Sequence, residues 1–340
     1  MTFDERVDAL RGLGFSERQT RFLVTVALHS GFCLPRHYTA SAGLQYGAGV
    51  RVFFDRLVER KLARRLTFRR DRGHVYQLHA SWIYDQIGQD DNRNRRHASA
   101  ALIARKLMLL DFVLQEPAAD WYATEADKVA LFTTRLGIPI ADLPRRKYVS
   151  KDRTGPCTVR YFVHKLPISF RPVSGQVTFV YLVTEATSDL FAQFVEDHLA
   201  MLGRLRLWRI VAVGPRHSRG LQGCGAALSS IAQGRSKSRP IAEVDALDKY
   251  FTWREAHERG DYSWLTNVSR VGIEWHNFRR RFAAMEYEQL FDRWKLDGPY
   301  ALPMPVGSSL LKALKEGSGQ LEVQSLPIRY DRFGTRPGVS

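Results

Sequence analysis

One stretch, residues 32–79, decides how the rest of the chain is interpreted. It opens with a polar segment and a short break, Leu34-Pro35-Arg36-His37-Tyr38-Thr39-Ala40-Ser41-Ala42 and Gly43-Leu44-Gln45-Tyr46-Gly47. From Ala48 to Lys61, apolar residues then recur with the i, i+3, i+4, i+7 spacing of one helix face: Val50, Phe53, Phe54, Leu57 and Val58. Residues 62–68 and 74–79 follow as two expected strands, joined by Arg69-Arg70-Asp71-Arg72-Gly73. The predicted order is helix, tight turn, helix, and a hairpin with a basic tip.

This order resembles the winged helix-turn-helix family. The resemblance implies that the helix at 48–61 enters the major groove, where its side chains reach base edges. That helix carries Arg51, Arg56 and Arg60 on its polar face, and these are the residues we expect to read DNA. The hairpin tip carries Arg69, Arg70 and Arg72, which we expect to hold the sugar–phosphate backbone.

The charge of this stretch supports a DNA contact. From Arg51 to Ala80, nine Lys or Arg stand against three Asp or Glu, a balance of +6. Phosphates attract such a surface whatever the base sequence. The alternative is a winged helix used for protein contacts, with its arginines as a solvated face. The full set of expected DNA-binding residues is Arg36, Gln45, Arg51, Arg56, Arg60, Arg69, Arg70, Arg72, His74, Arg279 and Arg280.

The composition of the whole chain bounds its partners and location. The 340 residues suffice for about two or three domains, and 44% are hydrophobic. The formal charge of +16 favours nucleic acid, with an anionic membrane surface as the other candidate. Because no apolar run reaches the ~18 residues of a membrane helix, and no secretory signal is recognisable, we expect a cytoplasmic protein without a membrane partner. Three widely spaced cysteines (Cys33, Cys157 and Cys224) argue against a disulfide scaffold or a metal site.

The first domain is expected to span residues 1–80. A short helix at 3–13 ends at Gly14, and a second runs from Glu17 to His29 with Ser16 and Gln19 in capping-box positions. Residues 81–97 are polar and charged and are expected to form a linker, or a surface loop within one domain.

Residues 98–300 are expected to form an α/β domain with a helical extension. The helix at 99–115 is apolar around most of its circumference, so it lies between layers or forms a homodimer interface. Thr124 is the expected N-cap of a helix at 125–136. Strands are expected at 158–170, 177–184 and 205–213, with a helix at 189–203 between the last two, which implies a parallel pair.

Residues 214–240 are rich in glycine, serine and arginine and are expected to be an exposed loop. Helices are expected at 241–260 and at 272–296, the second with Arg279-Arg280-Arg281 in its middle. Trp275, Phe278 and these arginines form an aromatic and basic cluster that grips nucleic acid or, equally, belongs to a core helix with a solvated face. The segment 301–340 is expected to be partly disordered, with a helix at 309–316 and a strand at 321–323.

The order of elements in the middle of the chain resembles the restriction-endonuclease-like core. Together with the preceding winged helix, it resembles the replication-relaxation family, through His164-Lys165-Leu166 in an expected strand and residues 179–183 running into Thr184-Glu185-Ala186-Thr187. This resemblance implies a DNA-associated accessory protein of a plasmid or other mobile element.

A nuclease of the restriction-endonuclease-like fold needs a particular set of residues. Enzymes of this fold hold Mg²⁺ with carboxylates on neighbouring strands and place a lysine two residues after the second. Residues 158–170 and 177–184 contain neither Asp nor Glu, which indicates an inactive version used for binding or dimerisation. The remaining carboxylate candidates are Glu125, Asp127 and Glu185.

Other catalytic signals are weak. The glycines of residues 220–225 fit neither a phosphate loop nor a dinucleotide fingerprint, and Cys224 near His217 lacks an orienting partner. We expect no catalytic residues, no metal and no cofactor.

The sequence therefore predicts an α+β or α/β protein that binds duplex DNA sequence-specifically, as a transcriptional regulator or a replication or transfer accessory with a protein partner. The alternatives are a metal-dependent nuclease and an assembly scaffold.

Overall fold

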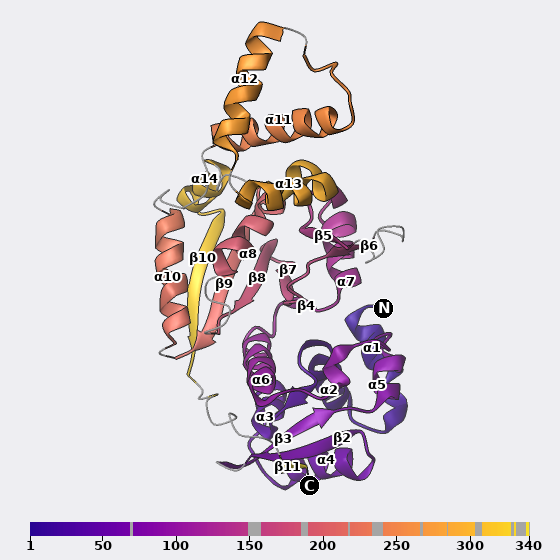
Figure 1. Ribbon diagram of the computed structural model, residues 1–340. Coiled ribbons are helices and arrows are strands. Elements are labelled where there is room, and N and C mark those ends of the chain that lie inside the picture. Colours follow the sequence, from indigo (N-terminus) through magenta and orange to yellow (C-terminus); the bar gives the residue numbers. More distant parts are fainter. Residues whose placement is uncertain are drawn as a thin grey trace.

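The computed structural model describes residues 1–68, 71–148, 158–184, 190–216, 218–232, 241–265, 268–283, 285–302, 308–327, 330 and 338–339. The protein combines helices with a mixed β-sheet, so the α+β class is confirmed. Figure 1 shows three parts along an elongated molecule: a unit built from the N-terminal elements, a central sheet, and a helical arm at the far end.

The N-terminal unit contains four helices and a small antiparallel sheet. The helices are α1 (Phe3–Ala9), α2 (Glu17–His29), α3 (Pro35–Ala42) and α4 (Ala48–Glu59), with η1 (Arg11–Leu13) after α1. The strands are β1 (Phe32–Cys33), β2 (Ala63–Phe68), β3 (Asp71–Leu78) and β11 (Gly338–Val339), in the order β1-β3-β2-β11. The expected order of helix, turn, helix and hairpin is confirmed, as is the capping box of Ser16 and Gln19 at the start of α2.

The segment 81–97, expected to be a linker or surface loop, packs on this unit. It forms α5 (Ser81–Gln86) and η2 (Arg93–Arg95), and Ile83, Tyr84 and Ile87 are buried in the N-terminal core. The Asn94 amide donates to the carbonyl oxygens of Ala27 and Leu28, at 2.9 and 3.0 Å. The charged composition of this segment concealed the few apolar residues that hold it in place.

Helix α6 (Ala100–Leu114) lies between the N-terminal unit and the central sheet (Figure 1). Leu110 belongs to the N-terminal core, whereas Ile103, Leu107 and Phe112 pack in a second core with sheet residues such as Val211. Of the two expectations for this apolar helix, burial between layers is confirmed.

The central sheet has five strands in the order β10-β9-β8-β7-β4. They are β4 (Asp120–Tyr122), β7 (Ile168–Arg171), β8 (Gln176–Leu182), β9 (Trp208–Pro215) and β10 (Gly319–Leu326). Strands β8, β9 and β10 are parallel, and β7 and β4 are antiparallel to their neighbours. Helices α8 (Phe191–Asp197) and α9 (Leu199–Leu202) connect β8 to β9, which confirms the expected parallel pair.

Both faces of this sheet are covered. Val180 and Val211 face the core that contains α6, while Phe179 and Ile210 face a core with α8 and the residues that follow α7 (Glu125–Ala130). Strand β8 is buried from Val177 to Leu182, as the apolar run predicted. After α7 come η3 (Leu131–Arg135) and η4 (Ile140–Asp142), with Thr124 as the N-cap of α7, as expected.

The single strand expected at 158–170 is wrong. Residues Thr158–Tyr161 form β6, which pairs with β5 (Arg145–Tyr148) in a separate two-stranded sheet. The chain then turns, with Phe162 at φ 50° and Lys165 at φ 54°, before β7 begins. Positive φ is incompatible with a continuing strand, so His164-Lys165-Leu166 lies in a loop.

Two expectations for the C-terminal half also need correction. The region expected as an exposed loop contains α10 (Arg219–Ala232), with Leu221 and Cys224 buried against the sheet; His217 and residues 233–240 lie outside the described residues. The long helix expected at 272–296 is two helices, α12 (Val268–Arg281) and α13 (Met285–Asp297), so the three arginines end α12. The remaining elements are α11 (Ile241–Glu258), η6 (Gly298–Ala301) and α14 (Ser308–Glu316).

Candidate nucleic-acid interface

Helix α4 is fixed to its unit by a buried aromatic cluster. Phe53 and Phe54 are 2% and 1% exposed. The Phe53 ring centre lies 4.5 Å from that of Tyr38 on α3, and the Phe54 ring centre lies 4.4 Å from that of Tyr76 on β3. Because these buried aromatic contacts stabilise the packing of one face of α4, the opposite face of the helix is turned outward.

That outward face and the turn before it are open to solvent. Tyr46 and Val52 are 62% and 63% exposed, and Gln45 and Arg51 are exposed beside them. A Cβ added at Gly43, Gly47 or Gly49 would meet no atom within 4 Å. No side chain caps the start of α4, so its first backbone N–H groups are accessible to an anionic ligand.

The three arginines of α4 are not equivalent. Arg51 lies on the open face. The guanidinium carbon of Arg56 lies 4.8 Å from the Phe15 ring centre, and that of Arg60 lies 5.3 Å from the same ring. Arg60 also donates from Nη1 to the Leu13 carbonyl oxygen at 2.5 Å. The protein therefore uses Arg56 and Arg60 to hold the connection between α1 and α2 beside α4.

Arg36, at the start of α3, is engaged within the protein. Both of its Nη atoms donate to the buried carboxylate of Asp111 on α6, Nη2 at 2.7 Å. The same carboxylate accepts from His37 Nε2 at 3.0 Å and from the Tyr330 hydroxyl at 2.6 Å. Since His37 Nδ1 accepts from the Leu34 N–H, its proton is on Nε2. The network joins α3, α6 and the segment after β10.

These contacts set the charge state of Asp111. Burial alone would raise the pKa of the Asp111 carboxyl, but the hydrogen bonds and charges of His37 and Arg36 outweigh burial and hold that pKa well below its ordinary value. Burial lowers the pKa of His37, and the hydrogen bond and charge of Asp111 oppose that shift. A buried ionised carboxylate with three donors is a structural junction, which sequence reasoning missed because Asp111 is 75 residues from Arg36.

The hairpin supplies further basic residues next to α4. Arg65 on β2 is exposed, and Arg64 donates from Nε to the Gln77 amide oxygen at 2.8 Å. Arg72 belongs to β3, whereas Arg69 and Arg70 lie outside the described residues. His74 is half-buried, with its Nδ1 at 3.4 Å from the Thr67 hydroxyl across the hairpin.

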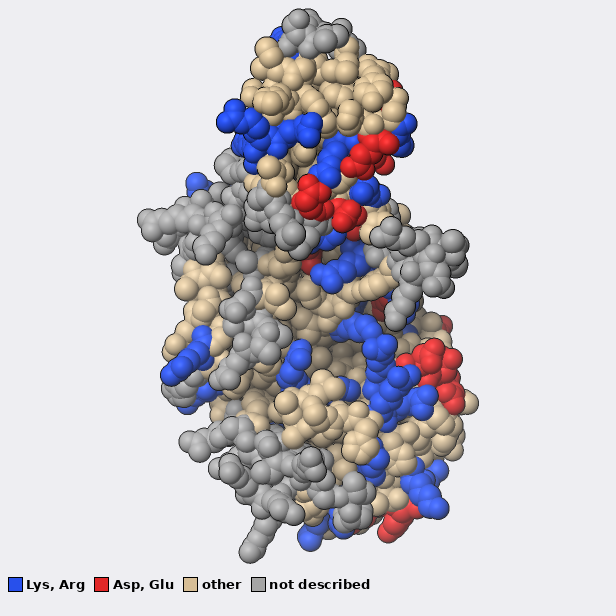
Figure 2. Space-filling model, in the orientation of Figure 1, with Lys and Arg blue, Asp and Glu red and all other residues tan. Residues whose placement is uncertain are grey.

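Arg279 and Arg280 are exposed, but they are not near α4. They end α12, at the opposite end of the molecule from the N-terminal unit (Figure 1). Figure 2 shows basic side chains gathered over that end of α12, with acidic and further basic side chains below them. The sequence-predicted DNA-binding residues thus fall on two surfaces.

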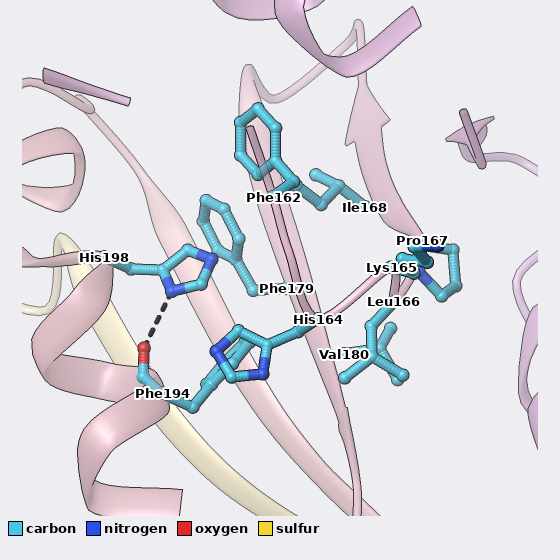
Figure 3. Close-up of a pocket in the computed structure, with 10 residues that line it drawn as sticks. All are labelled: Phe162, His164, Lys165, Leu166, Pro167, Ile168, Phe179, Val180, Phe194 and His198. Carbon is cyan, nitrogen blue, oxygen red and sulfur yellow. Dashed lines mark hydrogen bonds between the residues drawn. The ribbon is translucent and has the colours of Figure 1, made fainter. Parts of the chain in front are cut away.

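A second polar cluster lies beside a small hollow between the loop at 162–167, the start of β7, β8 and α8 (Figure 3). His164 Nε2 lies 3.1 Å from Asp197 Oδ2, and His198 Nδ1 bonds the Phe194 carbonyl oxygen at 2.7 Å. His198 is buried, and burial lowers its pKa to about 4. Apolar side chains from Phe162, Phe179 and Phe194 line most of the hollow.

Lys128 on α7 is buried close to this cluster. Its Nζ lies 5.9 Å from the Phe162 ring centre, and burial lowers the pKa of the amine to about 7, against the opposing charges of Asp127 and Glu125. The arrangement could orient an imidazole and keep an amine partly neutral.

The carboxylates proposed for a nuclease have other roles here. The Asp127 carboxylate accepts hydrogen bonds from both Nη atoms of the buried Arg6, at 2.9 and 3.0 Å. Glu125 accepts from the Tyr161 N–H at 2.8 Å and lies 3.6 Å from Arg160. Glu185 is outside the described residues. Within the described ranges, no three His, Cys, Asp or Glu side chains are grouped so as to hold a metal ion.

Comparisons of the chain with protein-family models, with curated proteins and with solved structures found no match. Among the helices described, none combines the length and apolar character needed to cross a membrane.

Proposed function

We propose that this protein binds duplex DNA sequence-specifically through α4 and the adjacent β2–β3 hairpin. The observation that carries the proposal is the two-sided character of α4. Its inner side is locked by buried aromatic rings, and its outer side presents exposed Arg51 and Val52 beside an open, uncapped first turn. An α-helix presented in this way fits the major groove.

Each exposed group suits a different part of DNA. Arg51 can donate two hydrogen bonds to the O6 and N7 atoms of guanine, and the Val52 side chain suits the methyl group of thymine. The N–H groups at the start of α4 and the basic residues of the hairpin, Arg65 among them, suit phosphate oxygens. Arg36, Arg56 and Arg60 support the frame and are not assigned to DNA.

The order of elements supports a finer proposal for the fold. Helices α2 to α4 followed by a hairpin are typical of a winged helix. Helix α7, the β7–β8 hairpin, α8 and β9 parallel to β8 follow the order of the restriction-endonuclease-like core. We propose that this second part is used for binding rather than cleavage, in a transcriptional regulator or a replication or transfer accessory.

The test is the affinity for random duplex DNA across salt concentration, followed by selection of a preferred site. The logarithm of the association constant should fall steeply with the logarithm of salt concentration, by about 0.9 for each phosphate neutralised. Arg51→Ala should lower affinity for the selected site more than for random DNA, whereas Arg70→Ala should lower both. Arg146→Ala, which removes an exposed charge from β5, is the matched control and should change neither.

Two results would contradict the proposal. An absence of binding to any duplex at low salt would remove it and favour a scaffold that contacts protein. Equal losses for Arg51→Ala and Arg70→Ala on selected and random DNA would remove the assignment of α4 to base recognition.

A further inference from the structure

The arm formed by α11 and α12 carries an aromatic cluster for which duplex recognition has no use. The arm projects from the body at the end opposite the N-terminal unit (Figure 1). Its base is a small core in which Phe251, Phe282 and Phe291 are fully buried. This core joins α11, α12 and α13 at the base of the arm.

Three of the seven tryptophans lie on this arm, in contact with one another. The ring centres of Trp253 and Trp264 are 5.1 Å apart with an interplanar angle of 21°, and those of Trp264 and Trp275 are also 5.1 Å apart. All three indoles are only partly buried. Trp264 Nε1 donates to the Asp261 carbonyl oxygen at 2.9 Å, which helps to fix the ring between α11 and α12.

The rim of this cluster is more exposed still. Tyr262 is 54% exposed, and its ring centre lies 5.4 Å from that of the exposed His257, which in turn lies 5.5 Å from Trp275. Aromatic rings placed side by side at the surface are characteristic of binding sites, because a soluble protein otherwise covers such a surface.

Basic side chains border the rings. Lys249 Nζ lies 4.6 Å from the Trp253 ring centre. Arg279 follows Trp275 by about one helical turn, so both lie on one face of α12. Burial raises the pKa of the Tyr250 phenol, and the nearby charge of Arg279 acts to lower it. Neither Arg279 nor Arg280 forms an ion pair with a carboxylate in the described part of the chain, whereas Arg254 binds Glu288 at 2.7 Å. Arg279 beside the rings, and Arg280 next to it near the end of α12, are thus without an acidic partner among the described residues.

We propose that the α11–α12 arm binds single-stranded nucleic acid, with unpaired bases stacking on the rings of Tyr262, Trp264 and Trp275 and phosphates contacting Arg279 and Arg280. Partly exposed aromatic rings bordered by arginines are the combination that holds unpaired bases, whereas the paired bases of a duplex offer no face for stacking. This site goes beyond the proposed duplex-binding surface and does not depend on it. Because the two lie at opposite ends, a protein with both could hold a duplex next to an unpaired strand.

The test uses the full chain and an oligothymidylate of about 20 nucleotides, long enough to span an aromatic and basic site and free of base pairing. Binding is followed by anisotropy of a labelled oligonucleotide and by quenching of tryptophan fluorescence. We expect binding that quenches the fluorescence, and roughly a fivefold or greater loss of affinity in Tyr262→Ala and in the Arg279→Ala/Arg280→Ala double variant.

Two controls separate this proposal from the first. Trp82→Ala removes an aromatic ring that is 40% exposed on α5, outside the arm, and should leave oligothymidylate affinity unchanged. Arg51→Ala should weaken duplex binding and not oligothymidylate binding, whereas the arm variants should do the reverse. Tyr262 is mostly exposed, so its removal tests the site without disturbing the core.

Unchanged oligothymidylate affinity in both arm variants would overturn the proposal. So would an absence of oligothymidylate binding combined with binding to phosphatidylserine vesicles that the arm variants abolish, since the arm would then contact a membrane surface.

Discussion

The two basic surfaces of this protein differ in what their arginines contact. In the N-terminal unit, Arg36 binds Asp111, Arg56 stacks on Phe15, and Arg60 donates to Leu13. On the arm, Arg279 and Arg280 are exposed and pair with no described carboxylate. A basic residue next to a candidate DNA-reading helix can therefore serve to hold the fold together, while one far from it can be available to a ligand.

The largest difference in the free energy of unfolding should follow from removing an aromatic ring beneath each of the two surfaces. Phe53→Ala empties a fully buried site and should lower the free energy of unfolding by roughly 4 kcal/mol. Trp264→Ala removes a partly exposed ring with two indole contacts and should cost about 2 kcal/mol. Urea denaturation followed by circular dichroism measures both. Equal losses would show that the arm is as tightly packed as the support of α4, and Val52→Ala on the open face of α4 is the control.

The carboxylates that contact basic residues should also differ in how much they contribute to stability. Asp111→Ala leaves Arg36 and Tyr330 without their buried partner and should destabilise the fold by roughly 3 kcal/mol. Glu274→Ala on the arm breaks an exposed pair with Lys249 and should cost less than about 0.5 kcal/mol. Denaturation midpoints for the two variants provide the comparison, which fails if Asp111→Ala is as mild as Glu274→Ala.

Lowering the pH should weaken the hydrogen-bond network of Asp111 in particular. Because the pKa of Asp111 in the folded protein lies below the value of about 4 for an unfolded chain, its ionised form stabilises the fold above that pH. This contribution is lost as pH falls through about 4 toward the folded-state pKa. Asp111→Asn should therefore flatten the loss of stability between about pH 5 and pH 3, by roughly 1 kcal/mol or more. An unchanged slope in that variant would mean that other carboxylates govern acid unfolding.

The smallest effects on stability are expected from substitutions of the arginines themselves. Arg56→Ala and Arg60→Ala each remove a ring contact to Phe15 and should cost about 1 kcal/mol of stability. Arg279→Ala and Arg280→Ala should stay within about 0.5 kcal/mol of the unsubstituted protein. Thermal unfolding of the four variants measures these losses, and a cost at Arg279 equal to that at Arg60 would assign Arg279 to the frame.

The local sequence pattern was enough to predict those helices and strands whose apolar residues repeat with a clear period. The apolar spacing predicted α2, α4 and α6, and the continuous apolar run predicted β8. Pattern failed where the backbone turns at residues that normally avoid positive φ, Phe162 and Lys165, and where α10 forms despite three glycines because Leu221 and Cys224 are buried against the sheet. The roles of Arg36 and Arg60 depend on partners distant in the chain, so no local reading of the sequence could assign them.

The position of α6 has a consequence for how the molecule melts. One helix completes both the N-terminal core, through Leu110, and one side of the central sheet, through Leu107 and Phe112. Neither part can lose the helix without exposing apolar surface in the other, so the two should unfold in a single cooperative transition. A ligand bound at α4 would then raise the melting temperature of the sheet as well. In calorimetry of the unlabelled protein, DNA binding at the N-terminal unit should therefore shift the one transition in which the sheet also unfolds.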